Sequence, residues 1–176
     1  MKQTFRKKRG GRVQPLPSRN TLDRQLDHYR HTIALPAIEI ETAAALKLHE
    51  STAIKERVHG SNLALYRCVR PEVTTAADVL ELCRQVGLKR LDRGSAANVA
   101  GLTRLQVTQS SLKRYVPYTN RELNWHTDGY YNPVDRRIRG MLLHCVAAAA
   151  AGGTSEFIDH AIVYTLLHHA DPAYPI

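Results

Sequence analysis

Residues 126 to 128 read His-Thr-Asp, a spacing that could place two metal ligands side by side. If this segment is a β-strand, side chains two residues apart project from the same face. The Cα atoms of His126 and Asp128 would then lie roughly 6.5 Å apart. An imidazole and a carboxylate, joined by a second imidazole from elsewhere, form the facial triad that holds non-haem iron(II). The spacing therefore predicts two of three iron ligands.

The same spacing recurs at His169-Ala170-Asp171, so the pattern alone is weak evidence. That second pair falls where a predicted helix meets Pro172. Because side chains two residues apart on a helix do not share a face, we expect His169 and Asp171 to be structural.

What distinguishes His126 and Asp128 is the order of the motifs around them. The chain runs from NWHTDGYYNP through an apolar MLLHCV and a GGTS turn to FID. This series resembles the taurine dioxygenase-like (TauD/TfdA) family of iron(II)- and 2-oxoglutarate-dependent oxygenases. The resemblance is clear over residues 115 to 165 and loose over residues 60 to 110.

The resemblance implies roles for individual residues. His126 and Asp128 match the iron-binding His and Asp of the family, which makes them both the metal ligands and the catalytic centre. Ser155 matches a hydroxyl residue that contacts the carboxylate of 2-oxoglutarate. A Thr is commoner there, and Ser keeps the O–H donor. Asp159 matches a position that we expect to be structural.

The resemblance also implies a reaction. Family members use Fe(II) as cofactor and 2-oxoglutarate as co-substrate. The chain is therefore expected to be an oxidoreductase, a dioxygenase that uses O2 to hydroxylate a C–H bond of a small organic substrate while 2-oxoglutarate is decarboxylated to succinate. Tyr130, Tyr131 and Asn132 follow the ligand pair closely enough to be substrate-pocket candidates, with core positions as the alternative for the aromatic residues.

Two parts of the family's site have no counterpart by motif. The second iron-binding His of the family lies roughly a hundred or more residues beyond the first, followed by an Arg that pairs with 2-oxoglutarate. This chain ends at Ile176. We expect a chain truncated before both residues, resembling the N-terminal part of the domain. The later histidines are expected to be structural, and they are His144, His160, His168 and His169.

A barrel built from its first strands alone leaves a second interpretation open. Such a barrel would expose sheet edges and one face of its core. Two metal ligands without a third should also bind iron weakly. The alternative is a non-catalytic remnant or interaction module of the same fold, either as a homo-oligomer or with a partner that completes the barrel.

The elements expected to position these residues are helices first and strands later. Apolar periodicity and capping residues predict helices at residues 21–31, 41–59, 74–87 and 160–170. Alternating or short apolar runs predict strands at residues 62–69, 102–109, 123–130, 138–146 and 155–159. The fold class is α+β with a mainly antiparallel sheet. The resemblance specifies a partial double-stranded β-helix (jelly roll, cupin-like) with packed N-terminal helices.

Charge and composition bound the remaining classes. The net charge is +9, and much of the excess lies in residues 1–20, expected to be a basic, disordered tail before a domain at 21–176. We expect no nucleic-acid partner, no membrane partner and a cytoplasmic location, since no apolar run approaches the roughly 20 residues that span a bilayer. The cysteines lack CxxC spacing and are expected to be small core residues, and they are Cys68, Cys83 and Cys145.

Overall fold

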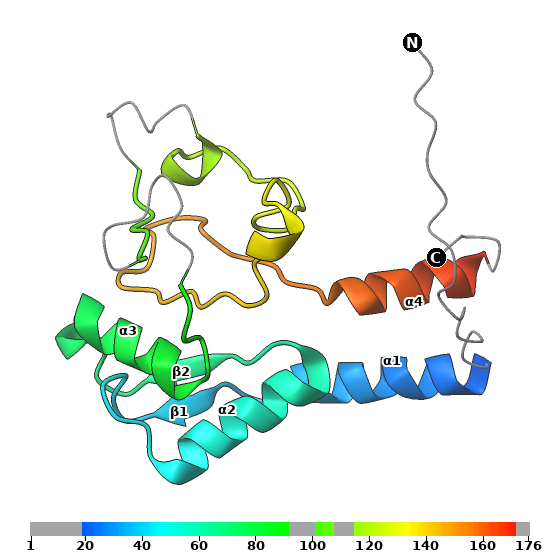
Figure 1. The fold of residues 1–176 in the computed structure, drawn as a ribbon, viewed down its shortest axis with the longest axis horizontal. Coiled ribbons are helices and arrows are strands. Elements are labelled where there is room, and N and C mark those ends of the chain that lie inside the picture. Colours follow the sequence, from blue (N-terminus) through cyan, green and yellow to red (C-terminus); the bar gives the residue numbers. More distant parts are fainter. Residues whose placement is uncertain (1–18, 92–100, 108–114, 172–176) are drawn as a thin grey trace. The chain divides into compact units, whose positions relative to one another are not determined.

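The computed structural model describes residues 19–91, 101–107 and 115–171 (Figure 1). The chain divides into two compact units, which are considered one at a time. The first unit takes the chain up to Leu35 and from Glu156 onward, and the second takes Pro36–Ser155. The predicted basic tail lies outside the described residues, except that Arg19 and Asn20 belong to the first helix.

Two antiparallel helices form the first unit, α1 (Arg19–Ala34) and α4 (His160–Ala170) (Figure 1). A small apolar cluster of Leu26, Tyr29 and Ile162 joins them. The Tyr29 hydroxyl accepts the Asp159 N–H at 3.2 Å near one end. The Asp159 carboxylate accepts the Ala161 N–H at 2.8 Å, so this residue caps α4. The helix predicted at residues 160–170 is confirmed, and the one predicted at 21–31 extends further at both ends.

A short β-α-β arrangement begins the second unit. Strand β1 (Ile38–Ile40) pairs in parallel with β2 (Tyr66–Cys68), with Ile38 opposite Tyr66, and α2 (Leu48–Ser61) connects them. A helical crossover returns the chain to the end of the sheet where β1 began, which makes the pair parallel. The expectation of a mainly antiparallel sheet is therefore wrong for the described residues, whose sheet has two parallel strands.

The core of this unit lies around the two strands, α2 and α3 (Ala76–Gln85) (Figure 1). Its buried members are Ile40, Ala43, Ile54, Cys68 and Leu82. Two of the cysteines, Cys68 and Cys83, are buried as predicted. The prediction for Cys145 is wrong, because that thiol is exposed.

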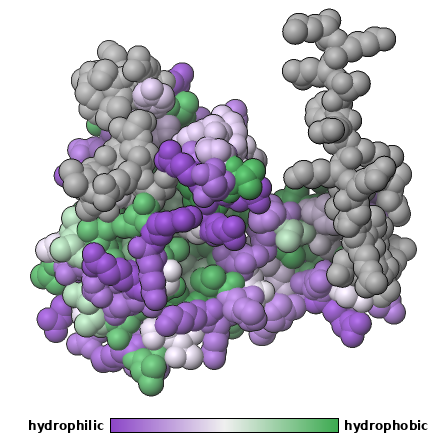
Figure 2. Space-filling view, in the orientation of Figure 1, coloured by the Kyte–Doolittle hydropathy of each residue, from purple (hydrophilic) through white to green (hydrophobic). Residues whose placement is uncertain are grey.

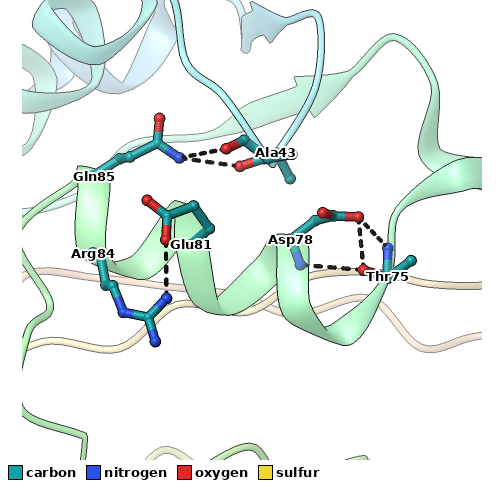
Figure 3. A network of polar contacts seen from close by, with 7 residues as sticks. Ala43, Thr75, Asp78, Glu81, Arg84 and Gln85 are labelled. Carbon is teal, nitrogen blue, oxygen red and sulfur yellow. Dashed lines mark hydrogen bonds and ion pairs between the residues drawn. The ribbon is translucent and has the colours of Figure 1, made fainter.

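Helix α3 begins at a Thr cap, as its sequence predicts, and the structure adds the reciprocal bond of a capping box. The Thr75 hydroxyl accepts the Asp78 N–H at 3.2 Å, while the Asp78 carboxylate accepts the Thr75 N–H at 2.8 Å (Figure 3). The N–H and hydroxyl donors of Thr75 lower the pKa of Asp78 from its usual value.

Helix α2 starts later than predicted because two side chains hold the preceding segment out of the helix. The Glu50 carboxylate, 4% exposed, accepts the Glu41 N–H at 2.9 Å and the Lys47 N–H at 2.7 Å. The Gln85 amide oxygen accepts the Leu46 N–H at 2.6 Å. These bonds satisfy main-chain donors that a longer helix would have used internally. At its other end α2 passes Gly60 and ends at Ser61.

Residues predicted to form later strands lack strand pairing. No strand is assigned within the described residues 101–107, 123–130, 138–146 or 155–159, and predicted strand residues 108–109 lie outside the description. Strands persist through hydrogen bonds to a neighbour, and the backbone of residues 138–155 makes none to another described residue. The described residues therefore do not confirm the expected jelly roll. The three-residue β1 was not predicted.

The visible surface mixes hydrophobic and hydrophilic residues (Figure 2). Several large apolar side chains of the second unit are mostly exposed, and they include Trp125, Tyr130, Tyr131, Val134 and Val146. None of the described helices is both long enough and apolar enough to cross a membrane.

The ties from Gln85 to the segment before α2 predict a stability effect. The Gln85 amide nitrogen also donates to the Ala43 and Ala44 carbonyls, at 3.3 and 3.2 Å (Figure 3). Replacing Gln85 with Ala leaves three main-chain groups without this partner. We expect the free energy of unfolding, measured by urea denaturation, to fall by about 2 kcal/mol.

Gln106→Ala is the matched control, because Gln106 is exposed and has no side-chain hydrogen bond to another described residue. Its free energy of unfolding should change by less than about 0.5 kcal/mol. Equal effects of the two substitutions would contradict the role assigned to Gln85.

Candidate metal centre

The side chains of His126 and Asp128 point toward the same place. His126 Nε2 lies 3.7 Å from Asp128 Oδ1. The two side chains are 41% and 45% exposed, so the space between them is open to solvent. The imidazole and the carboxylate therefore lie close together, while their role as iron ligands stays a prediction.

A main-chain hydrogen bond determines which ring nitrogen faces Asp128. His126 Nδ1 lies 2.8 Å from the Asn124 carbonyl oxygen. A carbonyl oxygen can only accept, so Nδ1 must carry the proton and donate it. In the neutral ring, Nε2 then has a free lone pair. This is the arrangement that metal-binding histidines use, with one ring nitrogen anchored and the other available.

The convergence does not come from a β-strand, as had been expected. Residues 128–131 form a turn, and Gly129 has a φ of +68°. The Asn132 N–H donates to the Gly129 carbonyl at 2.9 Å and closes the turn. Thus the predicted strand is wrong, while the turn and the anchored His126 ring bring the two groups together by another route.

Two acceptor atoms facing each other create a site for a cation. An unprotonated Nε2 and an ionised carboxylate are both hydrogen-bond acceptors, so there is no donor between these two atoms, which lie 3.7 Å apart. Two ligands held at roughly 2.1 Å from one ion lie roughly 3.0 Å apart at a right angle and farther apart at wider angles. The observed 3.7 Å corresponds to an angle of roughly 120° at the ion, so the two groups must approach by about 0.7 Å to take the right angle of a facial triad. The nitrogen and oxygen donors themselves are the types that iron(II) takes.

A third protein ligand is not assembled around this pair. Among the described residues, no group of three or more His, Cys, Asp or Glu side chains could hold a metal ion. His169 pairs with Asp23 at 3.1 Å, and His168 is buried on α4 with no hydrogen bond to Nδ1 from a described residue. His160 is exposed, at 91% of its side chain, beside Asp159.

His144 is occupied by a contact that sequence reasoning missed. Its Nδ1 lies 2.8 Å from the Tyr66 hydroxyl, and the two rings are stacked with centroids 5.9 Å apart. Burial raises the pKa of Tyr66 to about 12, with smaller contributions from Cys83 and Cys68, while burial lowers the pKa of His144. Both side chains therefore favour their neutral forms at neutral pH.

The stretch from Ile138 to His144 connects the turn after His126 and Asp128, hereafter the metal pair, to the core of the second unit. The Ile138 side chain lies against Gly129, Leu142 packs against the core cluster, and His144 contacts Tyr66. These inward contacts recur at even-numbered positions, while Met141 and Leu143 are exposed. This packing has the period of two of a β-strand, whereas the sequence predicted a strand here from a short apolar run.

Ser155 is exposed and follows two glycines with left-handed backbones, Gly152 and Gly153, at φ +67° and +75°. Among the described residues, no hydrogen bond or ion pair connects Ser155 to His126 or Asp128. Its expected contact with 2-oxoglutarate stays a prediction.

The aromatic pocket candidates belong to the turn itself. Tyr130 and Tyr131 stack edge to face with centroids 5.3 Å apart, and they are 78% and 76% exposed. They are surface residues in this structure, which excludes the alternative that they belong to the described core. Asn132, in contrast, is partly buried.

The sequence matches the model of one protein family. The model of the family described as "Taurine catabolism dioxygenase TauD, TfdA family" matches residues 24–174. No curated protein and no solved structure gives a significant match. The matched range is wider than the clear resemblance in the motifs, and it includes the helices of both units.

The Gly129 turn predicts a strong effect of a single methyl group. A Cβ at this position would lie 2.6 Å from Ile138 Cδ1 and 2.8 Å from its Cγ1, in a left-handed backbone that L residues avoid. We expect Gly129→Ala to lower the free energy of unfolding by about 3 kcal/mol in urea denaturation, the sum of backbone strain and overpacking.

Gly152→Ala separates the two causes, because Gly152 has nearly the same φ and no atom within 4 Å of an added Cβ. We expect its cost to be about 1 kcal/mol, from backbone strain alone. If both variants lost the same stability, Ile138 would not hold the turn as described.

The lowered pKa of His144 predicts a dependence of stability on pH. The unfolded chain takes up a proton near the ordinary value of 6.5, while folded His144 resists protonation until a lower pH. Its contribution is therefore complete above pH 6.5 and is lost as the pH falls toward the folded value. We expect His144→Gln to flatten this acid decrease in the free energy of unfolding, measured in urea between about pH 7.5 and 5.

His49→Gln is the control, since His49 lies exposed on α2 in the same unit. An acid decrease that stayed unchanged in His144→Gln, or that flattened equally in His49→Gln, would show that the burial of His144 does not set it.

Proposed function

The chain belongs to the taurine catabolism dioxygenase TauD, TfdA family, and on that premise we propose that it is an Fe(II)- and 2-oxoglutarate-dependent dioxygenase acting on a C–H bond of a small organic substrate. Family members typically use Fe(II) and 2-oxoglutarate. The observation that carries the proposal for this chain is the approach of His126 Nε2 to the Asp128 carboxylate.

His126 and Asp128 are the proposed iron ligands. The Asn124 carbonyl keeps the Nε2 lone pair directed at the ion, and the carboxylate supplies charge. Bound there, Fe(II) supplies the redox chemistry by which O2 hydroxylates the substrate while 2-oxoglutarate is oxidised to succinate and CO2. The protein's own part is to hold the two ligands and to leave the remaining positions open.

Ser155 is the proposed contact for a carboxylate of 2-oxoglutarate. Its hydroxyl is exposed and has no hydrogen bond to another described residue, so the donor is available to a ligand. The left-handed glycines before it form a turn that residues with a Cβ would not readily adopt. The cupin-like jelly roll typical of the family is the proposed setting for these three residues.

A two-ligand site has a consequence for affinity. Within the described residues of the second unit, no other histidine joins His126 and Asp128. We propose that water, 2-oxoglutarate or a partner polypeptide fills the remaining positions. Iron binding by this chain alone is then weak and requires high metal concentration.

The test is anaerobic titration of the full chain with Fe(II) and 2-oxoglutarate. We expect the weak visible charge-transfer band of the chelate, and succinate release on admission of air. His126→Ala and Asp128→Ala should each weaken the apparent iron affinity by more than about tenfold, because each removes a direct ligand. His169→Gln is the control, since it disrupts the other His-x-Asp pair and should leave the band unchanged.

A folded wild-type chain that gives no band at any iron concentration would contradict the proposed activity. That result would favour the alternative, an interaction module of the same fold. Exposed apolar side chains of the second unit support this alternative, among them Met141, Leu143 and Val146. The backbone of residues 138–155 has no hydrogen bond to another described residue, so it also suits pairing with a strand of a partner.

A further inference from the structure

Asn132 binds both halves of the loop that follows Asp128. Its main-chain N–H donates to the Gly129 carbonyl at 2.9 Å, and its side-chain Nδ2 donates to the Arg136 carbonyl at 3.1 Å. A third bond, from the Arg136 N–H to the Pro133 carbonyl at 2.9 Å, closes the second half. One residue thus connects the Gly129 turn to the short 3₁₀ helix at Val134–Arg136.

The Asn132 side chain also lies against the turn itself. Its Nδ2 is 3.2 Å from the position that a Cβ on Gly129 would take, on a glycine that is otherwise covered by Ile138. Asn132 is partly buried, whereas its neighbours Tyr131 and Pro133 are exposed. The amide therefore packs onto the backbone immediately after Asp128.

The Asp128 carboxylate depends on this backbone for its position. The one ion pair given for its carboxylate with a described side chain is the 3.7 Å approach to His126 Nε2, which is too long for a hydrogen bond. His126 has its own anchor at the Asn124 carbonyl, while Asp128 has no comparable side-chain anchor among the described residues. The turn and the residues that hold it must therefore fix where the carboxylate lies.

We propose that Asn132 is the positioning residue of the metal pair, and that it holds the Gly129 turn so that Asp128 and His126 reach the same ion. This inference rests on the proposed function. An amide is suited to the position because it donates to a carbonyl, whereas the carboxylate of an Asp has no hydrogen to donate when ionised. Loss of the bond frees the loop, and metal binding must then order it again.

The test uses Co(II) as a spectroscopic substitute for Fe(II), titrated into the full chain and followed by visible d–d absorption. The other histidines of the chain can also bind Co(II). The absorption assigned to the site is therefore the portion that disappears in both His126→Ala and Asp128→Ala. We expect Asn132→Ala to raise the Kd of that part about tenfold and to change the shape of its band. The thermal melting curve of the metal-free protein should show that the variant is still folded at the titration temperature.

Asn120→Ala is the matched control. Asn120 is exposed, lies outside the loop and has no side-chain hydrogen bond to another described residue. It should bind Co(II) with the wild-type Kd and band shape. Asn132→Asp is the second variant, since it keeps the side-chain size and removes the donor; it should show the loss of affinity even if Asn132→Ala does not fold.

Wild-type Kd and band shape in folded Asn132→Ala or Asn132→Asp would overturn the role of Asn132 and leave the proposed function intact. Absence in the wild-type chain of any Co(II) signal that depends on His126 and Asp128 would overturn both. A change in band shape separates positioning from a general loss of stability, because a fraction of unfolded protein would reduce the signal without altering its form.

Discussion

The hydrogen bond from the His126 ring to the Asn124 carbonyl determines which ring nitrogen faces Asp128. A carbonyl only accepts, so the proton is placed on Nδ1 and the Nε2 lone pair faces the Asp128 carboxylate 3.7 Å away. Two acceptors without a donor between them are favourable only when a cation or a proton joins them. The metal binding proposed for the pair rests on this local arrangement.

The rest of the second unit serves to hold the loop that carries this pair. Ile138 covers Gly129, and the chain that follows reaches the core through Leu142 and the ring of Tyr66 through His144. This stretch has no strand pairing among the described residues, yet it packs with the period of a strand. Within the described part of the chain, side-chain contacts therefore connect the candidate site to the parallel strands and their helices.

Sequence reasoning succeeded where the signal was local. The capping box at Thr75 and the proline after Asp171 are read directly from neighbouring residues, and the helices at those places were predicted well. It failed where distant residues decided the outcome, as when Gln85 accepts the Leu46 N–H from 39 residues away and helps to hold the segment before α2 out of the helix. The parallel pairing of β1 with β2 has the same origin. For the site, residue types identified the pair, while the turn at Gly129 required coordinates.

The most direct test of the central claim is the protonation of the His126 ring, observed by long-range ¹H–¹⁵N correlation NMR of the full chain at about pH 7.5, above the ordinary imidazole pKa. We predict the tautomer with the proton on Nδ1, and selective broadening of the His126 signals at the lowest Co(II) concentrations that affect any histidine. A proton on Nε2, or broadening of other histidines while His126 stays sharp, would show that this imidazole is not presented to a metal.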